Sequence, residues 1–183
     1  TYMGKPQATN LSDEINEAVM RNVITNLRRL IRNPDDDFAR GELMWASAMA
    51  ENGMLKLGKQ TDFQCHMIEH AVGAYTDCNH GQGLAVIHPA LYRRLLEAGK
   101  EKLARMAETV WGVKGTTIEE TAMRGIEALE AFIREIGLPT HWSEMGITDE
   151  SMLRAAADTC FITPGCCRQL TRDEIFELLM ERM

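Results

Sequence analysis

The sequence contains no apolar run close to the roughly 20 residues that a helix needs to cross a bilayer. Its first ten residues also lack the basic start and the apolar middle of a secretion signal. The five cysteines are an odd number without the spacing of a disulfide framework, which is typical of a reducing compartment. These absences predict a cytoplasmic protein with no membrane partner.

An excess of positive charge is missing as well. The chain has 20 Lys and Arg against 27 Asp and Glu, a formal net charge of −7, which argues against a nucleic acid as the partner. A length of 183 residues allows one domain with a substantial core, and 45% hydrophobic and 26% charged residues are the balance of a globular protein. We therefore expect residues 1–183 to form a single domain.

Strand signals are also absent. No segment shows four or more residues of clean apolar–polar alternation, and β-branched residues do not cluster. The sequence therefore predicts an all-α fold with seven to nine helices. In the first half of the chain we expect one helix capped by Ser12, one over residues 38–57 and one over about 62–75. The next helix opens at His80 and is interrupted or kinked by Pro89, and it continues over residues 91–111 with a possible break at Gly99. The last three helices are one behind the capping pair Thr116 and Glu119, one over about 149–159, and one opened by Thr171 and Glu174.

Two of these helices carry predictions about burial. The helix after Ser12 has apolar residues spaced by threes and fours, which predicts that this stripe is buried. Its members are Ile15, Ala18, Val19, Val23, Leu27, Leu30 and Ile31. The helix over residues 38–57 has apolar residues all round, which is typical of a central, buried helix.

Histidines form the least random feature of the chain. His66, His70 and His80 fall within 15 residues, whereas residues 1–60 contain no histidine. His66 and His70 are four residues apart, so on a helix they differ by about 40° around the axis and project from one face. His80 follows a turn and could approach the same point, and imidazole suits zinc, iron, copper or nickel. The spacing predicts a metal site. His88 and His141 are interpreted as structural.

Three other interpretations of this region compete. A di-iron bundle needs a glutamate three residues before a histidine, and Phe63, Met67 and Asp77 stand in those places, which excludes it. The segment 66–70 also fits His-x-x-Glu-His, in which two histidines bind zinc and the glutamate, here Glu69, activates water for peptide hydrolysis. That class of peptidase is built around β-sheet, which is not expected here. A non-catalytic helical interaction domain is the third interpretation.

A family resemblance covers nearly the whole chain. The segment His66-Met67-Ile68-Glu69-His70-Ala71-Val72-Gly73-Ala74-Tyr75, followed by Asp77 and His80-Gly81-Gln82-Gly83-Leu84-Ala85-Val86, resembles the metal-site region of the iron-dependent alcohol dehydrogenases, and most closely their butanol-dehydrogenase branch. Residues 42–47 and 136–144 resemble a buried helix and a late turn of the same family. The histidine spacing with Gly81 is the specific part of the resemblance.

The resemblance implies a fold and an activity. The fold is the dehydroquinate-synthase-like helical C-terminal domain of a two-domain enzyme that interconverts primary alcohols and aldehydes with NAD(H) or NADP(H). One aspartate and three histidines hold the divalent metal, most often Fe²⁺ and sometimes Zn²⁺. His66 and His80 match two of these histidines. His70 matches the active-site histidine that lies beside the metal and the nicotinamide without being a ligand.

The resemblance also implies what this chain does not contain. The aspartate and the first histidine belong to a helix expected before Tyr2, and no glycine-rich phosphate loop follows a strand. Residues 1–183 are therefore interpreted as one domain of a larger enzyme, inactive alone, whose coenzyme is bound mainly by another domain. We also expect a homodimer. Glu69 is interpreted as a surface group or a group that supports the site, and Gly81 and Gly83 as points of close approach or of helix packing.

Overall fold

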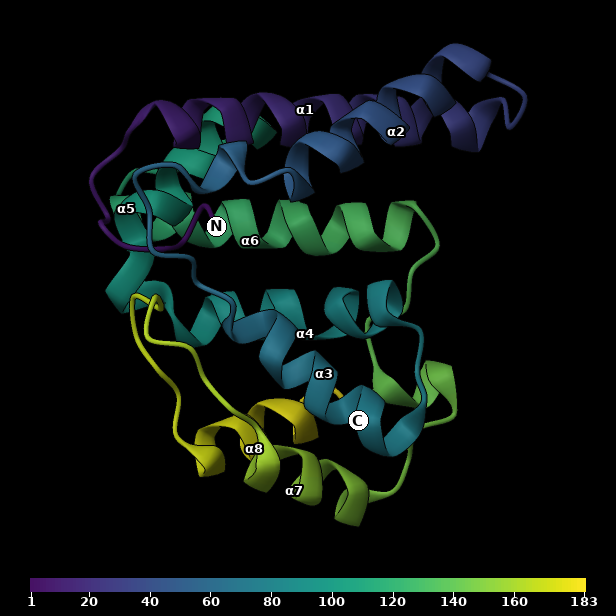
Figure 1. Ribbon diagram of the computed structural model, residues 1–183, viewed down its shortest axis with the longest axis vertical. Helices are drawn as coiled ribbons and strands as arrows, with labels where there is room; N and C mark the ends of the chain where they lie inside the picture. Colours follow the sequence, from purple (N-terminus) through teal and green to yellow (C-terminus); the bar gives the residue numbers. More distant parts are fainter.

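The computed structural model describes all 183 residues and is built from helices (Figure 1). The eight α-helices are Leu11–Arg32 (α1), Asp37–Glu51 (α2), Gln64–Thr76 (α3), His80–Arg94 (α4), Leu96–Met106 (α5), Ile118–Glu135 (α6), Glu150–Thr159 (α7) and Arg172–Met180 (α8). Short helical turns cover Met54–Lys56 (η1), Ala107–Trp111 (η2) and Trp142–Met145 (η3). The β-structure is limited to one isolated bridge between Lys5 and Gln60. The all-α prediction is confirmed.

The helices are stacked along the long axis of the molecule. Figure 1 shows α1 and α2 side by side at one end, α6 and then α4 and α3 below them, and α7 and α8 at the other end. Two apolar clusters hold this stack together. The larger joins α3, α4, α7 and α8 around Ile68, Leu91 and Leu178, and the smaller joins α5 and α6 to the N-terminal segment through Tyr2 and Met3. None of the helices combines the length and the apolar character needed to traverse a lipid bilayer.

The fully buried residues of helix α1 are not those of the predicted stripe. Asn10, not Ser12, is the N-cap, and it forms a reciprocal capping box with Asp13. The buried residues of α1 are mainly polar, namely Ser12, Asp13, Asn16, Glu17, Ile24 and Asn26. Ala18 and Ile31 of the predicted stripe are exposed, and its other five residues are only partly buried. The prediction was wrong because Asp13 and Glu17 pair with cations from distant segments, which compensates the cost of burying them.

Helix α2 was predicted to be central and buried, and this is also wrong. Ala39 and Ala46 are its buried residues, whereas Phe38, Met44 and Trp45 are exposed, Trp45 by 71%. The helix packs mainly on α1 and η1 at one end of the stack, as Figure 1 shows. An apolar pattern reports which side chains favour burial, but the position of the helix in the fold decides whether another element covers them.

Pro89 does not break the helix that contains it. Helix α4 runs through Pro89 to Arg94, and the irregular backbone comes later, at Gly99, where φ is −126° and ψ is 17°. Val86, Ile87 and Leu91 around the proline are at most 2% exposed. Burying three such side chains stabilises the helix by about 1.5–3 kcal/mol each, which together exceeds the roughly 3 kcal/mol that an internal proline costs.

The cap of α6 lies one residue beyond the predicted pair. Thr117, rather than Thr116, is the N-cap, and its hydroxyl accepts a hydrogen bond from the backbone N–H of Glu120 at 3.1 Å. Thr116 instead uses its own N–H and hydroxyl to bind the Glu120 carboxylate. Both registers place a threonine three residues before a glutamate, so the sequence pattern could not choose between them.

The predicted capping box of α8 is confirmed, and it permits a stability test. Thr171 Oγ1 accepts a hydrogen bond from Glu174 N at 3.2 Å, and Glu174 Oε2 accepts one from Thr171 N at 2.8 Å. Thr171→Ala is expected to lower the free energy of unfolding by about 1 kcal/mol because the backbone N–H of Glu174 loses its side-chain acceptor. Urea denaturation measures this. Thr25→Ala, at an exposed position within α1, is the matched control; equal losses in the two variants would contradict the role of the cap.

Candidate metal centre

The three clustered histidines come from two helices joined by a tight turn. Helix α3 carries His66 and His70 one turn apart, and its C-cap residue, Asp77, adopts the left-handed conformation with φ of 53°. Asn79 caps α4 by accepting a hydrogen bond from the backbone N–H of Gln82 at 3.2 Å. His80 is therefore the first residue of α4, and the turn directs it back toward α3.

The predicted convergence of these histidines occurs in the structure. The ring centroids of His66 and His80 are 5.2 Å apart, those of His70 and His80 are 5.2 Å apart, and those of His66 and His70 are 6.1 Å apart. His70 and His80 are exposed, whereas His66 is half-buried. The three rings are therefore neighbours, and imidazole is a ligand type that suits a divalent metal such as iron or zinc.

Electrostatics keep His66 in the form that binds metals. Burial lowers the pKa of His66 from its ordinary value, and the neighbouring His80 and His70 lower it further. A metal binds the neutral imidazole, so a lowered pKa leaves the ring available at and below neutral pH. The half-buried position of His66 thus favours the neutral ring over the charged one.

A fourth group in the cluster is Glu69, whose role the sequence left open. Its side chain is buried, and its Oε2 atom contacts Nδ1 of His80. Ligand atoms of Glu69, His70 and His80 lie within 4.8 Å of one another. The signal that could have found it is local: Glu69 follows His66 by three residues, so both project from one side of the helix, and a carboxylate near a ligand histidine commonly accepts the N–H of its ring.

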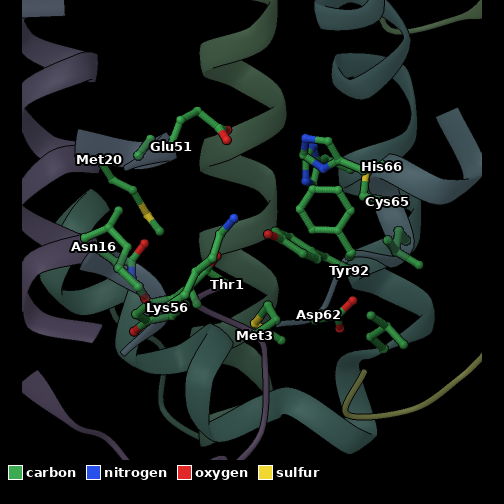
Figure 2. Close-up of a pocket in the computed structure, with 17 residues that line it drawn as sticks. Thr1, Met3, Asn16, Met20, Glu51, Lys56, Asp62, Cys65, His66 and Tyr92 are labelled. Atoms are coloured by element: carbon green, nitrogen blue, oxygen red, sulfur yellow. The ribbon is translucent and has the colours of Figure 1, made fainter. Parts of the chain in front are cut away.

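A pocket of about 220 Å³ opens on the other side of His66. Figure 2 shows His66 and Tyr92 on one wall and Asn16 and Met20 of α1 on the opposite wall, with Thr1 between them. The lining is mixed but mostly hydrophobic. Burial raises the pKa of Tyr92, so its hydroxyl stays protonated at neutral pH. The pocket therefore joins the buried edge of the histidine cluster to the N-terminal segment.

The remaining two histidines have other side-chain or backbone partners, although His88 lines the same pocket as His66. His88 hydrogen-bonds through Nδ1 to the backbone oxygen of Leu84 at 3.1 Å and packs on Tyr92, and burial lowers its pKa to about 4. His141 caps η3 and lies 3.4 Å from a carboxylate oxygen of Glu144. Each has a partner close to it in sequence, and the interpretation of both as structural stays a prediction.

Comparison with known proteins identifies the family. The model of the Fe-containing alcohol dehydrogenase family, C-terminal part, matches residues 1–183. The chain belongs to the iron-containing alcohol dehydrogenase family. It is 31% identical over 183 residues to the NADH-dependent butanol dehydrogenase A of Clostridium acetobutylicum, and the aligned region covers 97% of this chain and 47% of that protein. It is 29% identical over 151 residues to the NADPH-dependent aldehyde reductase YqhD of Escherichia coli, covering 82% and 39% of the two chains.

Solved structures of the family share the fold. The crystal structure of NADH-dependent butanol dehydrogenase A from Thermotoga maritima superposes with a TM-score of 0.88 at 29% identity, over 96% of this chain and 46% of that one. The substrate- and cofactor-free aldehyde reductase of Escherichia coli gives a TM-score of 0.88 at 26% identity, over 100% and 49%. The chain thus spans about half the length of the relatives that it matches.

Family membership decides between the interpretations of the segment 66–70. The zinc-peptidase interpretation is set aside, because the family model of the iron-containing alcohol dehydrogenases matches the whole chain, whereas the peptidase pattern covers only five residues. The geometry agrees, since Glu69 contacts His80 and is buried rather than facing solvent, where it would activate a water. A non-catalytic interaction domain would leave the convergence of the three histidines unexplained.

Proposed function

We propose that this chain is the metal-holding helical domain of an NAD(H)- or NADP(H)-dependent enzyme that interconverts primary alcohols and aldehydes. The single observation that carries the proposal is the convergence of His66, His70 and His80, in a chain that belongs to the iron-containing alcohol dehydrogenases. Fe²⁺ is the proposed metal, with Zn²⁺ as the substitute. The proposed oligomer is a homodimer, and small alcohols and aldehydes are the proposed substrates.

His66 and His80 are proposed to be the two metal ligands of this chain. A Lewis-acidic ion bound between them would polarise a carbonyl oxygen and lower the pKa of an alcohol. The remaining ligands are proposed to come from residues outside this sequence. Thr1 supports this, because it lines the same pocket as His66 and a segment preceding it would therefore lie next to the cluster.

His70 is proposed to be the catalytic histidine. It is exposed beside His80, so it can contact both a bound substrate and solvent. An imidazole accepts and donates protons near neutral pH, so His70 can deliver a proton to the oxygen of the substrate while hydride from the nicotinamide reaches the carbonyl carbon. The same histidine is proposed to contact the nicotinamide, whose remaining parts are bound outside this chain.

The test is an assay of the full native protein that carries this sequence, in parallel with residues 1–183 alone. The iron-loaded full protein is expected to oxidise NADH or NADPH when butanal is added. Residues 1–183 alone are expected to fold, to bind Fe²⁺ or Zn²⁺ weakly by calorimetry, and to show no turnover, because two ligands are fewer than the three or more of stable catalytic sites.

Two results would contradict this proposal. An iron-loaded full protein without activity on any primary alcohol or aldehyde would remove the dehydrogenase function. Aldehyde reduction by residues 1–183 alone, or a tight one-to-one metal site in them with sub-micromolar affinity, would show that the ligands and the division between domains are misassigned.

A further inference from the structure

The buried carboxylate of Glu69 has few partners for its charge. The side chain lies on α3 between the two histidines of that helix, and the residue is 2% exposed. Its one ion-pair partner is His80, through Oε2 and Nδ1, and no Lys or Arg lies within ion-pair distance. The other oxygen, Oε1, lies 3.8 Å from Sγ of Cys78. Because an unpaired buried carboxylate is costly, the contact with His80 is the main compensation for burying Glu69.

The first turn of α4 is shaped to admit this carboxylate. A Cβ atom at Gly83 would lie 2.8 Å from Cγ and 3.0 Å from Oε1 of Glu69, closer than normal packing allows. Gly73, one turn after Glu69 on α3, would place a Cβ 3.5 Å from the same Oε1, which is ordinary contact. The absent side chain at position 83 thus lets α4 approach α3 closely enough for Glu69 to reach the ring of His80.

The contact determines which nitrogen of His80 is free. A histidine that binds a metal through one nitrogen usually donates the N–H of the other to a carboxylate or a carbonyl, which holds the tautomer and the orientation of the ring. Nδ1 of His80 is the nitrogen that contacts Glu69. Nε2 is therefore the nitrogen left to bind an ion, and Glu69 holds the ring in the tautomer that exposes it.

We propose that Glu69 is the positioning residue for His80, with Gly83 providing the space that this requires. The inference rests on the proposed function, because it takes His80 as a metal ligand. It differs from a role of Glu69 as a ligand itself, which its closeness to His70 and His80 would also allow. Positioning accounts for both oxygens: Oε2 accepts the Nδ1–H of His80, and Oε1 lies toward Cys78 and Gly83.

The first experiment measures metal affinity in the full native protein. Glu69→Ala is expected to weaken Zn²⁺ binding by about 10- to 100-fold in calorimetry, the effect typical of removing the carboxylate partner of a ligand histidine. Glu69→Gln, whose amide oxygen still accepts a hydrogen bond, is expected to lose less. Gly83→Ala should also weaken binding, because the added Cβ displaces the carboxylate. Glu127→Gln and Gly41→Ala are the matched controls, since Glu127 is exposed on α6 and nothing lies within 4 Å of a Cβ at Gly41.

The second experiment reads the tautomer directly in metal-free protein. Nitrogen NMR of His80, at a pH where the ring is neutral, is expected to report the Nδ1–H form in the wild type. In Glu69→Ala the ring should shift toward the Nε2–H form. A role of Glu69 in folding alone would change the unfolding midpoint without changing the tautomer of the folded protein.

His80→Ala, measured in parallel, separates the two proposals. If His80→Ala leaves zinc affinity unchanged, the proposed metal site fails. If His80→Ala abolishes binding while Glu69→Ala and Gly83→Ala bind as the wild type does, the metal site stands and positioning by Glu69 is wrong. A loss in Glu69→Ala as complete as in His80→Ala would make Glu69 a ligand, and an unchanged tautomer in Glu69→Ala would remove its control of the His80 ring.

Discussion

Replacing His80 or His66 with alanine in the full native protein is expected to reduce the bound metal to background and to abolish aldehyde reduction. Each substitution removes a proposed ligand, so the loss should exceed the about 10- to 100-fold typical of removing a hydrogen-bond partner of a ligand. His70→Ala is expected to behave differently, because His70 is proposed to transfer a proton rather than to bind the ion. This variant should keep its metal and lose turnover, by about 10²- to 10⁴-fold for a general acid–base group.

The three separations between ring centroids do not by themselves distinguish a ligand from a catalytic histidine. The His66–His80 and His70–His80 pairs are both 5.2 Å apart. Metal content by elemental analysis, set against kcat for each variant, makes the distinction. His141→Ala is the control, since this ring lies in a loop beside Glu144 and should leave metal content unchanged. Loss of metal in His70→Ala, with metal retained in His66→Ala, would exchange the two assignments.

The second large effect is expected at Asp13. Its carboxylate binds the ammonium groups of Lys59 and Lys102, and the side chains of all three are at most 1% exposed. Asp13→Asn leaves two buried ammonium groups without a counter-charge, which should lower the free energy of unfolding by about 3–5 kcal/mol. Chemical denaturation measures this change. Asp35→Asn, at an exposed position without an ion pair, should change it by less than about 0.5 kcal/mol.

A double variant tests the cause of this loss. Lys102→Met in the Asp13→Asn background removes one of the two uncompensated charges and should recover part of the stability. If the free energy of unfolding of the double variant is instead lower than that of Asp13→Asn, removing the charge of Lys102 has not helped. The loss in Asp13→Asn then comes from packing and not from charge.

The same group makes stability depend on pH. Burial alone would raise the pKa of Asp13, but hydrogen bonds from Lys102 and Lys59 outweigh it and hold the pKa below its ordinary value of 3.8. A carboxyl whose pKa is lower in the folded protein binds its proton more readily when unfolded. Its contribution to stability is therefore complete above about pH 3.8 and is lost as the pH falls through the folded pKa. The stability difference between wild type and Asp13→Asn should shrink over that acidic range.

Local features of the fold and the site were predictable because they depend on neighbours in sequence. The capping box of α8 uses residues three apart, and the convergence of His66, His70 and His80 needs one helical turn and one short reverse turn. Features that depend on distant partners were not predictable. Asp13 can be buried because it pairs with Lys59 and Lys102. These partners lie 46 and 89 residues away in sequence, so the apolar periodicity within α1 gives no sign of them.

The sequence by itself determined that this protein is helical and that three histidines meet at the junction of α3 and α4, since backbone preferences and i, i+4 spacing act within a few residues. Only the tertiary structure decided that the polar face of α1 is buried, that Trp45 of α2 is exposed, and that Glu69 reaches the ring of His80. Burial of a charge depends on which opposite charges the fold brings to it, and exposure of an apolar side chain depends on which element covers it. Glu69 reaches His80 because α4 packs closely against α3. The absence of a side chain at Gly83 permits this close approach.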